Sequence, residues 1–234
     1  MATEPRVDST REKLLSSAVQ LFAERGFDGV SVRDIANAAG VNSGLVAYYF
    51  GGKKKLLSEV YMRYCTLLNL ERTRLLQQFN DQKNGPTLEQ ILEAFIRPSL
   101  KVTTDKHGRS EFTRLRAILS GENSALLERL IAENFDKSSH MFVVALSKCL
   151  PHLTREDVLW RFHFLLGAIY YTASGPHRIR ELSKGKCDPS DPIASAREMI
   201  PFLAAGFRAP QAGRNNPQTP SAPKSKAKRA NESQ

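Results

Sequence analysis

The segment from Ser31 to Leu57, SVRDIANAAGVNSGLVAYYFGGKKKLL, constrains the fold more than any other part of this chain. It predicts two short helices joined by a tight turn at Gly40, where a residue free to adopt positive φ is needed. Ser31 and Asp34 have the spacing of a capping box for the first helix, and Asn42 can cap the second. So small a helix pair, followed by three lysines, is typical of a helix-turn-helix whose second helix enters the major groove of DNA.

The second helix of this pair and the lysines after it carry the candidate DNA contacts. Ser43 and Gly44 are small, so the backbone there can approach a base edge or a phosphate closely. Tyr48 and Tyr49 place hydroxyl groups where a helix in the groove meets the sugar-phosphate backbone. A buried helical hairpin in another all-α protein is the alternative, and the coincidence of caps, turn glycine and basic exit weighs against it. The predicted DNA contacts are Arg33, Asn42, Ser43, Gly44, Leu45, Ala47, Tyr48, Tyr49, Lys53 and Lys54.

This region resembles the TetR family of bacterial transcriptional regulators, closely so from about residue 9 to 60. The residues that carry the resemblance are Leu14, Leu15, Ala18, Leu21, Phe22, Gly26, Phe27, Ile35, Ala36, Ala39, Gly40, Val41, Tyr49, Phe50, Lys53 and Leu56. The chain departs from the family pattern at Ala47, where a tyrosine is common, at Leu45, where a threonine is common, and at Gly51-Gly52. The Val46-Ala47-Tyr48 form is similar to a subgroup that includes fatty-acid-responsive repressors.

Apolar residues recur at helical spacing through most of the remaining chain, and the sequence has neither a strand pattern nor an internal repeat. Thr154 is expected to cap a long helix that Gly175-Pro176 stops. The other expected helices span Thr10 to Arg25, Lys53 to about Phe79, Thr87 to Ile96, Glu111 to Leu119, Ser124 to Leu150 and Ser190 to Phe207. We predict an all-α fold, with an N-terminal three-helix helix-turn-helix head and a C-terminal helical domain that, by the family resemblance, binds a ligand and dimerises.

The predicted domain organisation has four parts. They are a flexible arm at 1–8, a helix-turn-helix DNA-binding domain at 9–69 with its motif at 32–51, a helical effector-binding and dimerisation domain at 70–208, and a disordered basic tail at 209–234. The tail is rich in proline and has no aromatic residue, so it cannot bury enough surface to become ordered. It supplies much of the net charge of +10, so the high pI does not by itself indicate DNA binding. It can attract phosphate groups or simply keep the chain solvated.

The expected helix over 154–174 is apolar on nearly all faces, so it must be buried on more than one side. In so small a body we favour burial against a second copy of the chain. Its Trp-Arg-Phe-His-Phe run also resembles the C-terminal domain of the fatty-acid-responsive subgroup. Family members dimerise through their last two long helices, which implies a four-helix interface built from 155–174 and 191–207. The predicted interface residues are Ala168, Ile169, Tyr171, Phe202 and Leu203.

The interior of the body is the candidate effector site, although most of its apolar residues must be ordinary core. Arg114, Arg116 and Arg161 could pair with an anionic effector, and Arg161 could equally pair with Glu128 or Glu133. The subgroup resemblance implies a hydrophobic carboxylic acid or its CoA ester, so the expected effector is a fatty acid, an acyl-CoA or an aromatic acid. The predicted pocket residues are Phe95, Phe112, Leu115, Arg116, Leu119, Phe135, Arg161, Phe162 and Leu166.

No motif indicates an enzyme. The sequence has no glycine-rich phosphate loop or serine elbow, and its histidines and cysteines are scattered without metal-ligand spacing. His163 is interpreted as a buried structural histidine. We therefore expect no catalytic residue, no metal and no cofactor. The polar N-terminus, the three separated cysteines and the lack of an apolar run of about 20 residues lead us to expect a cytoplasmic protein without a membrane partner.

These observations predict a ligand-responsive, sequence-specific DNA-binding transcriptional regulator, a repressor that a small hydrophobic effector releases from its operator. It would bind palindromic double-stranded DNA as a homodimer, because one short recognition helix reads too few base pairs alone. The alternative is a non-specific nucleic-acid-binding protein or a helical interaction protein with the same basic head. Salt dependence and the ratio of specific to random DNA affinity separate these hypotheses.

Overall fold

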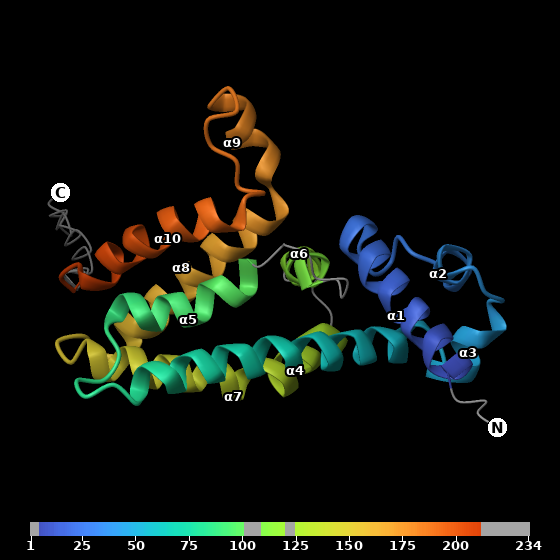
Figure 1. Cartoon of the computed structure of the whole chain (residues 1–234), viewed down its shortest axis with the longest axis horizontal. Helices are drawn as coiled ribbons and strands as arrows, with labels where there is room; N and C mark the ends of the chain where they lie inside the picture. The colour runs from blue at the N-terminus through green and yellow to red at the C-terminus, as the bar shows by residue number, and fades with distance from the viewer. Residues whose placement is uncertain (1–4, 101–108, 120–124, 212–234) are drawn as a thin grey trace, which may run out of the picture.

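The computed structural model describes residues 5–100, 109–119 and 125–211, which contain ten α-helices and no strand (Figure 1). The all-α fold class is therefore confirmed. The helices are α1 (Pro5–Arg25), α2 (Val32–Ala39), α3 (Gly44–Phe50), α4 (Lys53–Asn80), α5 (Leu88–Leu100), α6 (Arg109–Leu119), α7 (Ala125–Cys149), α8 (Arg155–Ser174), α9 (Pro176–Leu182) and α10 (Pro192–Arg208).

The first three helices form a head at one end of the molecule, and α4 runs from that head along the body (Figure 1). In α2 the predicted caps are present: the Ser31 hydroxyl accepts from the Asp34 N–H, the Asp34 carboxylate accepts from the Ser31 N–H, and Gly40 ends the helix at φ 68°. The boundary predicted at 69/70 lies inside the continuous helix α4. Head and body are therefore joined by a helix rather than by a flexible linker.

The N-terminal arm is shorter than predicted. The stretch 1–8 was expected to be flexible, but α1 begins at Pro5 and includes the second half of it. Proline is well suited to the first position of a helix, because its fixed φ is helical and it lacks the N–H that would be unpaired there. Residues 1–4 and 212–234, which hold most of the predicted disordered tail, lie outside the described residues.

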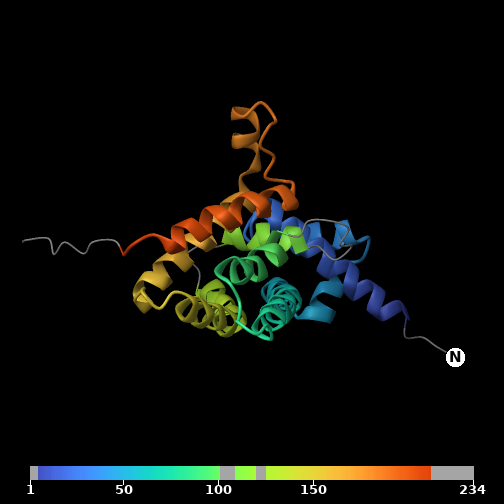
Figure 2. The same ribbon diagram turned by 60° about the vertical axis from the view of Figure 1, so that its left-hand side comes forward.

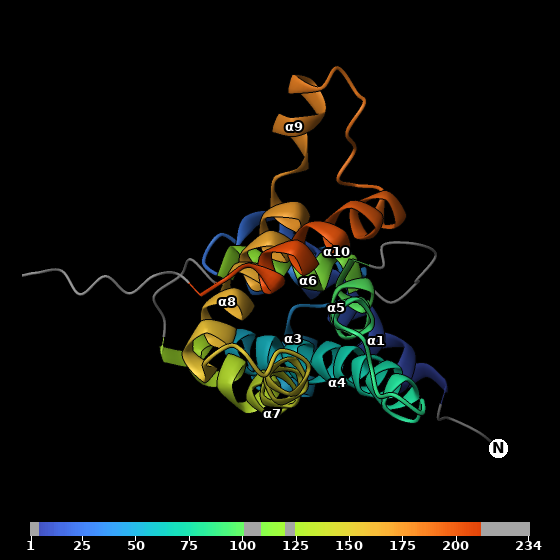
Figure 3. The ribbon, with the colours of Figure 1, turned by 90° about the vertical axis from the view of Figure 1, so that its left-hand side faces the viewer.

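Two apolar clusters lie one after the other along α4. The head cluster joins α1, α2 and α3 to the first half of α4, to α6 and to the first half of α7. The body cluster joins the end of α4 to α5, the second half of α7, α8 and α10. Figures 2 and 3 show α4 and α7 side by side on one side of the body and α8 with α10 on the other, and α5 contacts both α4 and α10.

Helix α9 is a feature that the sequence did not predict. The Gly175-Pro176 pair ends α8 as expected, but Pro176 then begins this short helix, which contacts α8 and stands away from the body (Figures 1 and 3). The capping predicted for Thr154 is confirmed, because its hydroxyl accepts from the Asp157 N–H. None of the described helices is long and apolar enough to cross a membrane.

The three cysteines are expected to differ sharply in reactivity. Cys65 is buried on α4, and burial raises the pKa of its thiol to about 12, whereas Cys187 is exposed. Since the thiolate is the reacting species, iodoacetamide at neutral pH should label Cys187 in the folded protein and leave Cys65 unmodified. Peptide mass spectrometry measures both sites, with the protein in denaturant as the control in which all three react. Equal labelling of Cys65 and Cys187 in the folded protein would contradict this burial.

Candidate DNA interface, dimer surface and effector site

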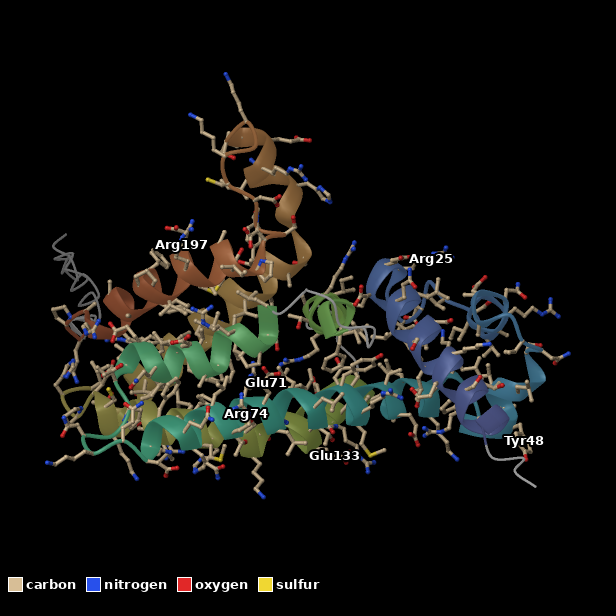
Figure 4. All side chains as sticks on the ribbon, in the orientation of Figure 1. Arg25, Tyr48, Glu71, Arg74, Glu133 and Arg197 are labelled. Carbon is tan, nitrogen blue, oxygen red and sulfur yellow. The ribbon has the colours of Figure 1, made fainter. Side chains whose placement is uncertain are left out.

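One face of α3 is anchored in the head and the opposite face is open. Val46 and Phe50, four residues apart, are 0% and 5% exposed in the head cluster. Gly44, Ala47 and Tyr48 are exposed on the other face, and Tyr48, which lies at the head end of the molecule in Figure 4, has 79% of its surface free. The small residues at 44 and 47 leave room for a close approach of this face to another molecule.

The start of α3 is held by Asn42. Its Oδ1 atom accepts a hydrogen bond from the Gly44 N–H at 2.8 Å, although the N-cap position is occupied by Ser43 and not, as predicted, by Asn42. The helix itself begins at Gly44, one residue later than expected, and the Ser43 side chain makes no capping bond. Arg33 on α2 is exposed, whereas Ser43, Leu45 and Tyr49 are half-buried at the edges of the open face.

The break between α3 and α4 explains one departure from the family pattern. Gly51 lies at φ 67° and Gly52 at φ 121°, both in conformations that other residues rarely adopt. The Gly51 N–H closes the end of α3 on the Ala47 carbonyl at 2.8 Å, and α4 begins at Lys53. The two glycines thus let two helices meet in a very short turn.

Lys53 is tied into the head, a role that its place in the lysine triplet did not reveal. Its Nζ atom donates to the carbonyl oxygens of Phe27 and Val30, each at 2.8 Å, and lies 4.2 Å from the centroid of the Phe27 ring. These contacts fasten the loop between α1 and α2 to the start of α4. One of the three N–H donors of Lys53 remains for a phosphate, so its DNA contact stays a prediction. Lys54 and Lys55 are exposed.

Two further arginines of the head serve as ties between helices. Arg11 on α1 pairs with Glu59 on α4 at 2.6 Å, and Arg63 on α4 pairs with Glu12 on α1. These cations are therefore partly neutralised inside the head. Arg33 on α2 and Lys54 and Lys55 at the start of α4 are exposed cations of the head.

Large apolar side chains are exposed on α8 and on α10, and we call them together the apolar stripe. We define it as Trp160, Phe164 and Tyr171 of α8, which are 57%, 60% and 62% exposed, together with Phe202 of α10, which is 75% exposed. Trp160 and Phe164 stack with ring centroids 6.0 Å apart. Exposed apolar patches of this kind usually mark interaction surfaces. The stripe lies on the two helices that were predicted to pair with a second copy.

Part of the predicted interface is wrong. Ile169 and Leu203 are 1% and 7% exposed and lie in the body cluster, so they form core, and Ala168 is half-buried. The inward face of α8 consists of Val158, Phe162, Leu165 and Ile169, whereas the apolar stripe occupies another face with the same helical spacing.

The prediction that His163 is a buried structural histidine is also wrong. Its side chain is exposed, with its ring centroid 6.1 Å from that of Trp160.

The predicted pocket residues are divided between the two clusters. The head cluster holds Phe112, Leu115, Leu119 and Phe135, the body cluster holds Phe95 and Phe162, and Leu166 packs against the latter. Arg161 does not belong to an interior pocket, and its guanidinium donates to the carbonyl oxygens of Phe207 at 2.5 Å and Pro210 at 3.1 Å. It thus satisfies carbonyls that the end of α10 leaves unpaired. Glu133, one of its suggested partners, pairs instead with Arg129.

Two buried arginines lie at the junction of the clusters. Arg116 is 5% exposed, stacks 3.6 Å above the centroid of Phe135 and donates to the Tyr170 hydroxyl at 2.5 Å. Arg72 on α4, which the sequence analysis missed, is 1% exposed and lies 3.6 Å from the centroid of Phe95. The sequence did contain an indication that Arg72 is buried. It stands four residues from Leu68 and from Leu76, both buried on the same face of α4.

A cavity of about 250 Å³ lies between the head and the body. Its wall includes Gln20 and Glu24 of α1, Ser99 at the end of α5, Thr113 of α6 and Thr172 of α8. Ser99 and Thr113 are buried, and the Thr113 hydroxyl donates to the Ser99 carbonyl at 2.8 Å. The cavity therefore touches a helix of the head and several helices of the body.

The relatives that resemble this chain in sequence are named as transcriptional regulators. Probable HTH-type transcriptional regulator YttP of Bacillus subtilis (strain 168) is 30% identical over 138 residues, which are 57% of this chain and 61% of the relative. HTH-type transcriptional repressor KstR2 of Rhodococcus jostii (strain RHA1) is 42% identical over 64 residues, 25% of this chain and 31% of that protein. These alignments span less than two thirds of either relative.

Solved structures and family models extend the comparison over both domains. The fatty acid degradation regulator FadR from Bacillus halodurans shares the fold, with a TM-score of 0.61 and 18% identity over 89% of this chain and 99% of that one. Residues 14–60 match the model for bacterial regulatory proteins of the tetR family, and 93–206 match the tetracyclin repressor-like C-terminal domain. Together the two models match more than half of the chain, head before body as in the structure, and the chain therefore belongs to the TetR family of bacterial regulatory proteins.

Proposed function

We propose that this protein is a sequence-specific, DNA-binding transcriptional repressor that a small hydrophobic effector releases from its operator. The observation that carries the proposal is the two-sided character of α3. Val46 and Phe50 fix the helix in the head, and the opposite face presents Gly44, Ala47 and Tyr48 to solvent. A rigidly held short helix with a small-residue face is suited to the major groove.

The contacts divide into two kinds. Ser43, Leu45 and Ala47 lie along α3 or at its start and would meet base edges, which carry the sequence information. Phosphate contacts would come from the exposed cations and from polar groups at the two ends of the helix, which set the position of the head on the duplex. These residues are Arg33, Asn42, Tyr48, Tyr49, Lys53 and Lys54.

Two copies would act together through the apolar stripe. One α3 helix has seven residues and reads too few base pairs for an operator to be distinguished in a genome. A homodimer would place two such helices on half-sites about 34 Å apart, one turn of the duplex. The stripe on α8 and α10 supports this pairing, because it gathers three large exposed aromatic side chains on one helix and a fourth on its neighbour.

Release would act through the junction between head and body. Helix α4 passes from one cluster to the other without a break, and α6, which packs in the head cluster, contacts both α1 and α8. An effector that displaces these helices would change the separation of the two α3 helices. Operator affinity would then fall, because both heads must fit their half-sites at once.

Operator selection tests the proposal. Gel shifts of a genomic fragment library, including the promoter of its own gene, at about 150 mM salt should show one fragment bound about 1,000-fold more tightly than random DNA.

Point variants distinguish base contacts from phosphate contacts. Leu45→Ala should change which DNA sequences are preferred. Lys54→Ala should weaken all DNA similarly and reduce the slope of log affinity against log salt by about 0.9, and Lys137→Ala on α7 is the matched control. Binding of all fragments alike would sink the repressor assignment in favour of a non-specific nucleic-acid-binding protein.

Effector and operator are expected to oppose each other. Linkage requires that an effector which lowers operator affinity by some factor binds the operator complex more weakly by the same factor, here about 5- to 150-fold. Calorimetric titration of the effector with and without operator gives that factor as the ratio of the two effector dissociation constants, and operator titrations with and without effector should give the same value. Fatty acids, acyl-CoAs and aromatic acids are the compounds to screen first. Equal effector affinities in the two titrations would mean that the bound compound has no regulatory role.

A further inference from the structure

Buried polar side chains gather where the two apolar clusters meet. On α4, Arg72 stands between Leu68 of the head cluster and Leu76 of the body cluster, and on α7, Ser138 stands between Phe135 and Phe142. We define the polar seam by the five buried polar or charged residues found in the described ranges: Arg72, Ser99, Thr113, Arg116 and Ser138. The seam draws residues from α4, α5, α6 and α7 to one region of the interior.

The two guanidinium groups of the seam are only partly satisfied. Arg72 donates from Nη2 to the Ser99 hydroxyl at 2.6 Å and from Nε to the Phe95 carbonyl at 3.2 Å, while its buried Nη1 has no hydrogen-bond partner. Arg116 donates from Nη2 to Tyr170, and its buried Nε has no partner. The Ser138 hydroxyl is likewise buried and unpaired. The two arginines contact hydroxyl and carbonyl oxygens and the faces of aromatic rings.

Such an arrangement is costly for the protein alone. Burial lowers the pKa of Arg72 well below its ordinary value, and the nearby positive charge of Arg116 lowers it further. The faces of Phe95 and Phe135 offset part of this cost through cation–π contact. Buried charges in proteins are normally paired with an opposite charge, so an oxyanion is the ligand group that would best lower this cost.

We propose that the polar seam binds the oxyanion group of a small amphiphilic ligand, a carboxylate or a phosphate, held by Arg72 and Arg116. Planar guanidinium groups match both oxyanions in geometry and charge. The surrounding rings of Phe95, Phe135 and Tyr170 suit an apolar ligand body. This inference rests on the proposed function, since it specifies the chemical class of the effector.

The cavity between head and body reaches the seam at Ser99 and Thr113. The Ser99 hydroxyl also accepts a hydrogen bond from Arg72, so one residue of the cavity wall contacts a guanidinium group of the seam. The volume of about 250 Å³ suits a small ligand, and the wall also includes Gln20 and Ala23 of α1. A ligand whose oxyanion lies in the seam and whose body fills the cavity would touch the head directly. Occupation of this site would thereby act on the position of α3.

Three probes of equal chain length test the class of ligand on the full-length, DNA-free protein. Octanoate and octyl phosphate carry an oxyanion, and 1-octanol does not. We expect the thermal midpoint of unfolding to rise with at least one anionic probe at constant ionic strength, and its affinity by calorimetry to exceed that of 1-octanol by about tenfold or more. The tighter of the two anionic probes decides between carboxylate and phosphate.

Substitutions in the seam separate binding from a structural role. Arg72→Met and Arg116→Met should each lower the affinity for the anionic probe by about tenfold or more. The midpoint of the ligand-free variants should stay equal or rise, because a buried unpaired charge has been removed. Arg74→Met is the matched control, since Arg74 lies on the same helix two residues away and is exposed (Figure 4). It should bind the probe as the unaltered protein does.

Three results would overturn the proposal. They are no response of the unaltered protein to either anion, equal binding of 1-octanol, and unchanged anion affinity in Arg72→Met. If the methionine variants do not fold, the comparison of the three probes on the unaltered protein decides alone. Because no DNA is present, these measurements can fail while an operator is still found, and an anion site can stand while no operator is found.

Discussion

Phe164→Glu is expected to convert a dimer of this protein into monomers that keep their helical content. Phe164 is 60% exposed on α8 and stacks on Trp160, so the substitution disturbs little in the single chain. If the apolar stripe is the dimer surface, the new carboxylate becomes buried without a partner on association. That loss is about 3–5 kcal/mol, or roughly a hundredfold to several thousandfold in the dimer dissociation constant. Sedimentation velocity at micromolar concentration measures it, and operator affinity should fall in parallel.

Ile169→Glu is the matched comparison on the same helix. Ile169 is 1% exposed in the body cluster, so a carboxylate there lies in the core whether or not a second copy is present. We expect this variant to lose stability as a monomer and to show a lower midpoint of thermal unfolding by circular dichroism. The two substituted positions are five residues apart on α8, so Phe164→Glu tests the exposed face of the helix and Ile169→Glu tests the buried face. A dimeric Phe164→Glu protein with normal operator binding would place the interface elsewhere.

Lys53→Met is expected to weaken DNA binding through the fold of the head. The substitution leaves the Phe27 and Val30 carbonyls without the ammonium that now donates to both, and the loop between α1 and α2 loses its attachment to α4. Hydrogen bonds to charged groups contribute about 1.5–3 kcal/mol each, and because Lys53 is half-buried we expect a total loss of about 2–3 kcal/mol. Thermal unfolding monitored by circular dichroism, together with gel shifts of the operator, measures the two effects.

Lys54→Met is the control for Lys53. Lys54 is exposed beside it at the start of α4, so its loss should leave the midpoint of unfolding unchanged and reduce DNA affinity only through charge. Because one phosphate contact is lost, the slope of log DNA affinity against log salt concentration should become shallower by roughly 0.9. The opposite outcome, in which Lys53→Met keeps its midpoint and changes the salt slope, would mean that Lys53 acts mainly on phosphate.

The features that were predicted well are those whose causes lie within a few residues of one another. The capping boxes of Ser31 with Asp34 and of Thr154 with Asp157 join residues three apart, and Gly40 ends α2 through a local backbone conformation. Helical periodicity likewise depends on neighbouring turns. The all-α fold, most helix positions and the open face of α3 could therefore be derived from the sequence. Helix α9 could not, because its seven residues, Pro176–Leu182, include only two large apolar side chains, Ile179 and Leu182, and are too few to show a helical period.

Residue roles that depend on distant partners were decided only by the tertiary structure. Lys53 resembled its two lysine neighbours until packing brought it to carbonyls 23 and 26 residues away. Arg161 reaches the end of α10 over 46 residues, and Arg72 meets Ser99 over 27. On α8, two apolar faces with the same spacing compete for the interior, and the volume and shape of the facing helices select Val158, Phe162, Leu165 and Ile169. Local pattern specifies that a helix has an apolar face, but which face lies inside is settled by the helices that pack against it.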